Sequence, residues 1–202
     1  MSGPLSEPGG GTPLTDSERQ GLRLPVLTRH ELNRAEADNI NQAMTWLFFA
    51  RRSLRPESVT EEAWLKLLHR RMYDQVWSWA GQYRTTDRNL GVPYWQIRME
   101  MRDVVADVQT WLADAGLARL SADECAVRFG YRLVVVHPFP NGNGRWSRLV
   151  SDALVVALGG RRFSWGGIAL TEAGQLRRRY IAALRAADTD RDFRPLLAFA
   201  RS

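Results

Sequence analysis

The sequence predicts a mainly α domain, and three observations lead to this fold class. Apolar residues recur at spacings of three to five along most of the chain after Thr28, as they do in amphipathic helices. Turn-forming residues gather in one stretch, from Ala80 to Tyr94, which favours a loop or a short hairpin there. The β-branched strands that alternate with helices in a parallel-sheet fold are missing. We therefore expect a helical domain with one short β-hairpin.

Length and composition favour a single globular domain. The chain has 202 residues, of which 45% are hydrophobic and 25% are charged. Proline and glycine interrupt any helical period in residues 1–27, so we expect an irregular arm there and one domain over residues 28–202. The longest apolar runs fall far short of the ~20 residues that cross a bilayer, and no secretory signal is visible. The single cysteine, Cys125, indicates a buried thiol in a cytoplasmic protein without membrane association.

The chain is basic, with 28 lysines and arginines against 22 acidic residues and a formal net charge of +6. A basic surface attracts nucleic acids and nucleotides. The basic residues are spread along the chain, apart from short clusters such as residues 177–179. This distribution favours a solvated, mildly basic surface over a nucleic-acid-binding face.

Local signals predict where the helices begin and end. Thr28 is a predicted N-cap, with Glu31 as its reciprocal partner in a capping box. A second helix is expected from Thr60, with a buried stripe made of Trp64, Leu67, Leu68, Met72, Val76 and Trp77. Ser121 is the predicted cap of a helix that runs towards His137, where two prolines end it. Further helices are expected from about Arg98, from Gly144 to Leu158, from Thr171, and from Phe193 to Phe199.

The most informative segment is the turn between two of these helices, residues 137–148, with the sequence HPFPNGNGRWSR. Its two glycines permit positive φ on either side of an asparagine, so that consecutive N–H groups can point into one concavity. The following helix adds the positive end of its dipole. Arg145 and Arg148 lie three residues apart and share one face of that helix. Together these donors predict an anion site whose size suits a polyphosphate.

His137 stands directly before this predicted anion site. Imidazole, with an unperturbed pKa of about 6.5, is the side chain best able to take a proton from a hydroxyl at neutral pH. A base beside a polyphosphate suggests transfer of a phosphoryl or nucleotidyl group to a hydroxyl, with Phe139 anchoring the loop in the core. A P-loop is excluded because no Gly-Lys-Ser/Thr follows, and the lone lysine, Lys66, is far away in the sequence.

This segment resembles the signature of Fic-domain proteins, His-x-Phe-x-Asp/Glu-Gly-Asn-Gly-Arg-x-x-Arg. The chain matches the signature at seven positions, which are His137, Phe139, Gly142, Asn143, Gly144, Arg145 and Arg148. The run from Trp79 to Thr85 resembles the start of the flap in Fic domains. Residues 11–14 and 31–33 resemble the Fic subgroup called mobile mystery protein B. The likeness to Fic domains covers about residues 28–200.

The resemblance implies a mostly helical Fic fold that transfers AMP from ATP to a Ser, Thr or Tyr hydroxyl of a target protein and releases pyrophosphate. It makes His137 the base that deprotonates the hydroxyl. The α- and β-phosphates would be held by the backbone of Gly142, Asn143 and Gly144. The Asn143 side chain would help, and Arg145 and Arg148 would contact the β- and γ-phosphates. A flap near residues 85–93 would hold the target as an added strand and includes Thr85, Thr86 and Gly91.

Asn141 departs from the signature, which has Asp or Glu at that position. The resemblance implies that this residue ligates the Mg²⁺ that bridges the phosphates of ATP. A neutral amide oxygen binds Mg²⁺ more weakly than a carboxylate does, so we expect weakened metal binding and a lower rate.

Many Fic proteins also carry an inhibitory helix whose glutamate occupies the second arginine of the signature. Glu36 is the candidate for that glutamate here, and an ordinary solvated helix residue is the alternative interpretation. If self-inhibition is missing, we expect a separate antitoxin-like partner to restrain the protein.

The sequence leaves three functions open. A Fic-type adenylyltransferase is favoured. A kinase-like relative would transfer the γ-phosphate of ATP instead of AMP. A non-catalytic module that binds nucleotides or nucleic acid would be consistent with Asn141 and with the basic charge, and its DNA binding would depend steeply on salt.

Overall fold

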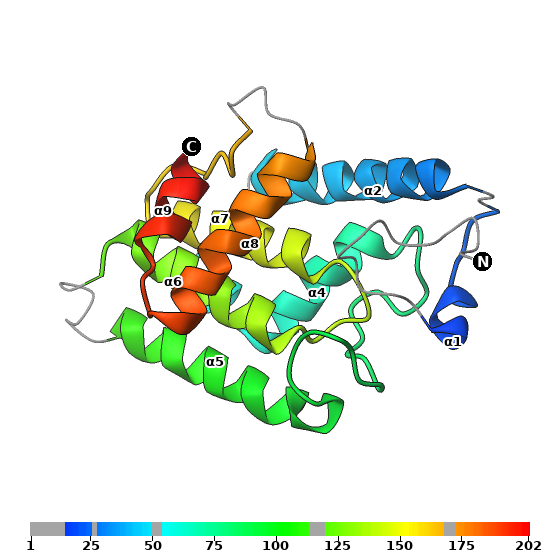
Figure 1. Ribbon diagram of the computed structural model, residues 1–202, viewed down its shortest axis with the longest axis horizontal. Helices are drawn as coiled ribbons and strands as arrows, with labels where there is room; N and C mark the ends of the chain where they lie inside the picture. Colours follow the sequence, from blue (N-terminus) through cyan, green and yellow to red (C-terminus); the bar gives the residue numbers. More distant parts are fainter. Residues whose placement is uncertain (1–14, 26–27, 50–53, 114–119, 168–172) are drawn as a thin grey trace.

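The computed structural model describes residues 15–25, 28–49, 54–113, 120–167 and 173–202. This part of the chain is mostly helical, which confirms the predicted fold class (Figure 1). Its helices are α1 (Asp16–Arg19), α2 (Arg29–Phe49), α3 (Pro56–Val59), α4 (Glu62–Tyr73), η1 (Tyr94–Gln96), α5 (Ile97–Ala113), α6 (Ala122–Val136), α7 (Asn143–Ala157), α8 (Ala173–Thr189) and α9 (Arg194–Arg201). Among the described residues, no helix combines the length and the apolar character needed to cross a membrane.

The consecutive helices α6 and α7 form the centre of the fold (Figure 1). α5 and α9 pack against α6, whereas α3 and α4 pack against α7. α2 packs on α4, and α8 packs on α9. The middle of α7 has no solvent exposure at Val150, Ala153, Leu154 and Val155. Because apolar surface surrounds both central helices, the loop that joins them is held in one place by the core.

The helix starts follow from local hydrogen bonds. The Glu31 N–H donates to Thr28 Oγ1 at 3.2 Å, and the Thr28 N–H donates to Glu31 Oε2 at 3.0 Å, so the predicted capping box is confirmed. Ser121 Oγ accepts the Glu124 N–H at 3.2 Å and caps α6 as expected. The predicted cap at Thr171 lies outside the described residues.

The prediction for α4 was largely correct, since Leu68, Met72, Val76 and Trp77 are buried, but the start of the helix and one residue of the stripe differ. The hydroxyl of Thr60 donates to the carbonyls of Pro56 and Glu57, so this buried residue closes α3 and α4 begins at Glu62. The buried face of α4 consists of Leu65, Leu68, His69, Met72 and Tyr73. Leu67 is 38% exposed. The face also includes a histidine and a tyrosine because both find partners in the loop after α6, which a periodicity based on apolar residues does not register.

The expected hairpin does not form, and residues 80–93 are a loop without strands. Arg84 gives the physical reason. Its buried guanidinium donates to the carbonyls of His137 (2.8 Å), Thr86 (2.9 Å) and Val92. The Arg84 side chain thereby fills the space between Thr86 and Val92, where the backbone hydrogen bonds of a hairpin would have to lie.

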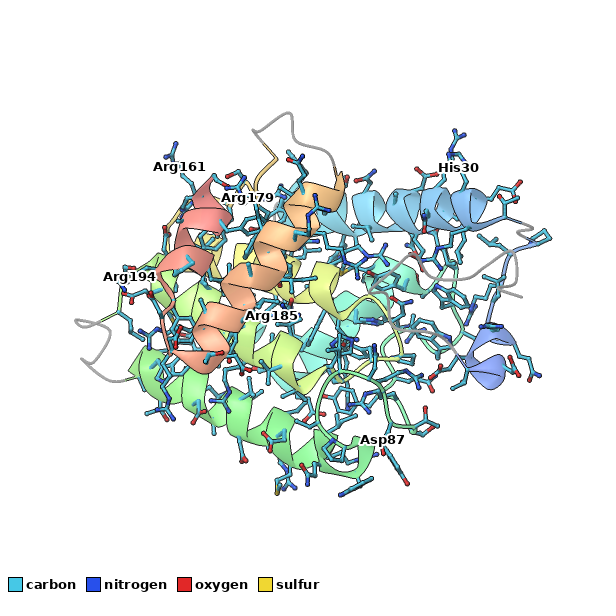
Figure 2. The ribbon with its side chains drawn as sticks, viewed as in Figure 1. His30, Asp87, Arg161, Arg179, Arg185 and Arg194 are labelled. Carbon is cyan, nitrogen blue, oxygen red and sulfur yellow. The ribbon has the colours of Figure 1, made fainter. Side chains whose placement is uncertain are left out.

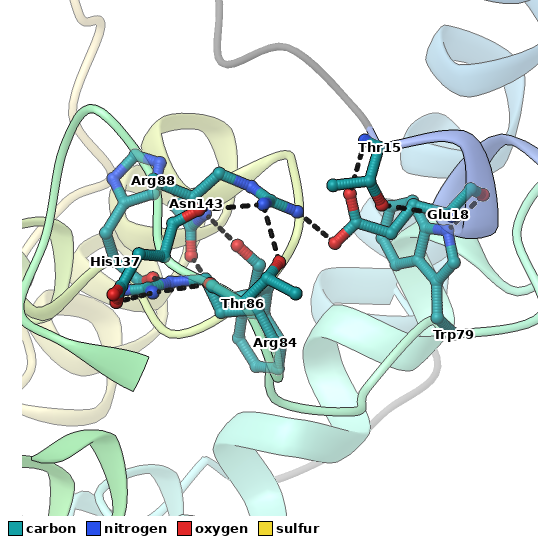
Figure 3. A network of polar contacts seen from close by, with 10 residues as sticks. Thr15, Glu18, Trp79, Arg84, Thr86, Arg88, His137 and Asn143 are labelled. Atoms are coloured by element: carbon teal, nitrogen blue, oxygen red, sulfur yellow. Dashed lines mark hydrogen bonds and ion pairs between the residues drawn. The ribbon is translucent and has the colours of Figure 1, made fainter. Parts of the chain in front are cut away.

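Part of the predicted N-terminal arm lies against the domain. Glu18 accepts a hydrogen bond from the Thr15 N–H at 2.8 Å and forms an ion pair with the largely buried Arg88 of the loop after α4 (Figure 3). Trp79 Nε1–H donates to the Glu18 carbonyl at 3.0 Å. An isolated antiparallel bridge then joins residues 22 and 77. Residues 15–25 therefore touch the loop that carries the predicted flap.

The basic surface is spread as the sequence indicates. Figure 2 shows exposed arginines over the side of the molecule that α8 and α9 form, including Arg161, Arg179, Arg185 and Arg194. Arg194 is paired with Asp192 at 2.8 Å.

Candidate active site

The loop between α6 and α7 turns sharply because left-handed residues stand at both of its ends. His137 is the C-cap of α6, with φ of 53°, and Gly142 is the N-cap of α7, with φ of 80°. A Cβ atom at Gly142 would lie 2.5 Å from the ring of Tyr73, so only glycine fits there. The Tyr73 hydroxyl lies 3.5 Å from the Gly142 carbonyl. The loop is thus shaped by its own sequence and by α4.

The amide side chain of Asn143 closes this loop. Asn143 Nδ2 donates to the Phe139 carbonyl at 2.8 Å, and Asn143 Oδ1 accepts the Phe139 N–H at 2.9 Å. The Asn143 side chain is buried and holds the loop together, and the expectation that it also helps to bind phosphate stays a prediction. Phe139 is fully buried and stacks on His69, with ring centroids 3.7 Å apart, and so anchors the loop as predicted.

His137 is held as a neutral imidazole. Its Nδ1 lies 3.3 Å from the Val134 carbonyl, and because a carbonyl only accepts, the proton belongs on Nδ1 and Nε2 keeps its lone pair. Burial, together with the positive charges of Arg84 and Arg88, lowers the pKa of His137 to about 4. At neutral pH the side chain is therefore a base that is ready to accept a proton.

The N-terminal end of α7 faces the same region. The N–H groups at the start of a helix lack acceptors within the helix, and the helix dipole is positive there. A Cβ atom at Gly144 would meet no atom within 4 Å, so there is open space beside Gly144, whereas Gly142 and Asn143 are buried. Asn141 Oδ1, the predicted metal ligand, accepts the Gly142 N–H at 2.5 Å and is therefore already hydrogen-bonded to the backbone of the loop.

Arg145 and Arg148 extend from the first turns of α7. The Arg145 guanidinium lies over the ring of Tyr73, 5.3 Å from its centroid, and its Nη2 donates to Glu36 Oε2 at 2.8 Å. Arg148 lies over the ring of Tyr180 at 5.1 Å, and its Nε donates to the Gly144 carbonyl at 3.2 Å. Both cations are thus positioned beside the start of the helix.

Glu36 is not a solvated helix residue. Its side chain is buried in α2, and its Oε1 accepts the Trp77 Nε1–H at 2.8 Å. The other oxygen contacts Arg145, the first arginine of the signature, whereas the sequence led us to expect the second. The Glu36 carboxylate therefore forms an ion pair with Arg145, one of the two arginines that are predicted to bind phosphate.

The predicted flap lies against the base. Thr85, Thr86 and Gly91 are exposed. Gly91 has φ of 93°, and a Cβ atom there would lie 2.5 Å from the Cβ of His137. The Val92 N–H donates to the Val136 carbonyl at 3.3 Å. These contacts bring residues 85–92 to the edge of the site.

Sequence reasoning missed three residues that shape the site, which are His69, Tyr73 and Arg84. His69 contacts Asn141 and Gly81 through its two ring nitrogens. Burial lowers the pKa of His69 to about 3 and raises the pKa of Tyr73 to about 12. Their signal in the sequence was weak: two polar rings on a helix face and one arginine in a loop, each with distant partners.

The fold and the site together define a class: a helical protein that holds a neutral histidine beside a helix terminus with two arginines. Comparison with known proteins identifies this class. Residues 59–155 match the sequence profile described as the Fic/DOC family. Over these residues the chain is similar to the Fic/DOC family, as the signature predicted. Its assignment to the mobile mystery protein B subgroup stays a prediction.

Two relatives are named as adenylyltransferases. The chain is 29% identical over 149 residues to a probable protein adenylyltransferase Fic of Escherichia coli, a match that covers 70% of this chain and 74% of the relative. It is 35% identical over 81 residues to protein adenylyltransferase fic-1 of Caenorhabditis briggsae. That second match covers 40% of this chain and only 16% of the relative, so the chain spans a small part of the nematode protein.

Solved structures share the fold. The BepC protein of Bartonella tribocorum, solved with bound AMPPNP, superposes with a TM-score of 0.66 at 18% identity and covers 93% of this chain and 97% of its own. An E274G form of Fic-1 from Caenorhabditis elegans gives a TM-score of 0.63 at 25% identity, over 90% of this chain and 51% of its own.

Proposed function

We propose that this chain transfers AMP from ATP to a hydroxyl side chain of a target protein. The observation that carries the proposal is the His137 imidazole, which is neutral, keeps Nε2 free of a proton and adjoins the N-terminal end of α7. The names of the Escherichia coli and Caenorhabditis briggsae relatives and the AMPPNP bound to BepC support it.

In the proposed reaction, His137 Nε2 takes the proton of the acceptor hydroxyl while the hydroxyl oxygen attacks the α-phosphorus of ATP. The bond between that phosphorus and the oxygen that leads to the β-phosphate breaks, and pyrophosphate leaves with the electron pair. AMP remains on the target oxygen. With its lowered pKa, His137 has no proton on Nε2 at pH 7, so this atom can accept the proton of the hydroxyl.

The phosphates would be held by the start of α7. We assign this role to the backbone of Gly142, Asn143 and Gly144, where the helix dipole favours negative charge. The Gly142 N–H would have to exchange its bond to Asn141 Oδ1 for one to the phosphate. Arg145 and Arg148 would add two guanidinium groups, which bind phosphate oxygens in pairs. Charge that develops on the leaving pyrophosphate would be stabilised by these fixed donors.

Magnesium fits this site only as a part of MgATP. The described residues contain no group of three or more His, Cys, Asp or Glu that could hold a metal. Asn141 offers one neutral oxygen, and that oxygen accepts the Gly142 N–H. A Mg²⁺ that arrives on the phosphates would neutralise part of their charge, with Asn141 as a weak ligand.

The target would bind along the flap. We assign this role to Thr85, Thr86 and Gly91, because they are exposed and the loop leans on His137. An extended target segment laid along this loop would bring a Ser, Thr or Tyr hydroxyl to the base.

Transfer is tested with ATP labelled at the α-phosphate, incubated with the chain and lysate proteins. Label on protein that is lost in His137→Ala supports the proposal. A parallel reaction uses ATP labelled at the γ-phosphate. Label that reaches protein only in that reaction indicates the kinase-like alternative. ATP binding without any transfer indicates a non-catalytic module. Asn141→Asp separates the last case from slow catalysis, because a carboxylate ligand should raise the rate of a weak enzyme and leave an inert one inert.

Glu36 is proposed to restrain the reaction, because it occupies the guanidinium that we assign to phosphate. The alternative is a separate antitoxin-like regulator. We place the reaction in the cytoplasm, where ATP is available and where a free buried thiol such as Cys125 is stable.

A further inference from the structure

A buried histidine outside the signature links the two halves of the site. His69 lies in the middle of α4 and has no solvent exposure. Its ring stacks on Phe139 at 3.7 Å with an angle of 19° between the planes. On one side of the ring is the loop between α6 and α7, and on the other is the first turn of the segment that becomes the flap.

Both ring nitrogens of His69 have a backbone partner. Nε2 lies 3.1 Å from the carbonyl of Asn141, and the N–H of Gly81 donates to Nδ1 at 3.0 Å. Because the carbonyl accepts and the amide donates, the proton must be on Nε2 and the lone pair on Nδ1. An apolar side chain of the same size would leave one backbone acceptor and one backbone donor without these partners.

Asn141 and Gly81, the two partners of His69, stand at the start of the predicted phosphate site and before the predicted flap. Asn141 directly precedes the glycine that caps α7, so its carbonyl sets the plane of the peptide that leads into the predicted phosphate site. Gly81, with φ of 79°, is fixed on the other side, because a Cβ atom there would lie 2.9 Å from the Lys66 carbonyl. It precedes by three residues the Arg84 that binds the His137 carbonyl.

We propose that His69 is a positioning residue that sets the phosphate-binding turn of α7 through its Nε2–H and the base of the flap through its Nδ1. This inference rests on the proposed function. The imidazole touches neither nucleotide nor target and acts through two peptide groups, so nucleotide binding depends on its donor and the order of the flap depends on its acceptor.

Two conservative variants separate the two nitrogens. A glutamine amide reaches the position of Nε2, so His69→Gln keeps a donor for Asn141. An asparagine oxygen takes the position of Nδ1, so His69→Asn keeps an acceptor for Gly81. His69→Phe keeps the stacking on Phe139 and loses both hydrogen bonds. His30→Gln is the matched control, because His30 is exposed on α2 (Figure 2).

The measurements are the affinity for MgADP by titration calorimetry and the amide exchange rate of Gly81. We expect His69→Gln to keep MgADP affinity within about threefold while Gly81 exchange accelerates. We expect His69→Asn to lose about tenfold or more in affinity while Gly81 stays protected. His69→Phe should lose both and the control neither. Nitrogen shifts of the wild-type ring should show a protonated Nε2.

The inference is overturned if His69→Gln and His69→Asn lose affinity and protection together, in proportion to their melting temperatures, since that is the pattern of a purely structural residue. It is also overturned if His69→Phe binds MgADP like the wild type. Neither measurement requires transfer, so a wild-type chain that binds MgADP but moves no AMP refutes the proposed function while the variants still test His69.

Discussion

Replacing Glu36 by glutamine separates the two things that its carboxylate does. One oxygen accepts the Trp77 Nε1–H, and the other accepts from the Arg145 guanidinium. The amide oxygen of glutamine can keep the first hydrogen bond, but the variant has no negative charge to oppose Arg145. Glu36→Gln should therefore release the guanidinium for phosphate while it weakens the ionic contact between α2 and α7.

The size of both effects follows from the geometry. A hydrogen bond to a charged group contributes about 1.5–3 kcal/mol, and because the Arg145 side chain is 36% exposed, solvent screening reduces this to about 1–2 kcal/mol. A nucleotide phosphate that no longer competes with the carboxylate would bind about 5–30-fold more tightly. The same loss should lower the melting temperature by roughly 2–8 °C.

The assay is titration of MgADP by calorimetry, paired with thermal unfolding. Glu36→Ala should be less stable than Glu36→Gln by a further ~1–3 kcal/mol, because it leaves the buried Trp77 N–H without an acceptor. Its affinity for MgADP should be no higher than that of Glu36→Gln. Asp38→Asn, an exposed change on the same helix, is the control. If Glu36→Gln binds MgADP no better than the wild type, the carboxylate only supports the fold, and a separate regulator becomes the better explanation.

Three further outcomes are expected. The transfer rate at saturating MgATP should stay level from pH 8 to about 5 and fall by half near pH 4. The reason is that His137, with its lowered pKa, stays unprotonated on Nε2 between pH 8 and about 5. A rate that falls by half near pH 6.5 contradicts this. Gly142→Ala should reduce the free energy of unfolding by about 2–5 kcal/mol in urea titrations, since its Cβ would meet a tyrosine ring at positive φ, whereas Gly144→Ala should change it little; equal effects would refute the argument. Glu18→Gln should speed amide exchange in residues 85–92, because Arg88 loses its ionic partner on α1, and unchanged exchange would show that the arm does not hold the flap.

The chain also shows how far local reasoning extends. The capping residues Thr28 and Ser121 were predicted correctly because each forms its hydrogen bond with a residue three positions away. The loop with His137 at its start was found for the same reason, since glycines, prolines and a helix terminus within a few residues determine its conformation. The mainly α fold class followed from the helical periodicity and from the lack of strands that alternate with helices.

Only the tertiary structure decided which side chains support that loop. His69 reaches Asn141 across 72 positions, and Arg84 reaches His137 across 53. Glu36 meets Arg145 across 109 positions and is buried instead of solvated. Polar groups such as these are buried only when a distant partner satisfies them, and their own neighbours in the sequence carry no record of that partner. The loop could therefore be predicted from its own residues, whereas its supports depended on how the helices pack.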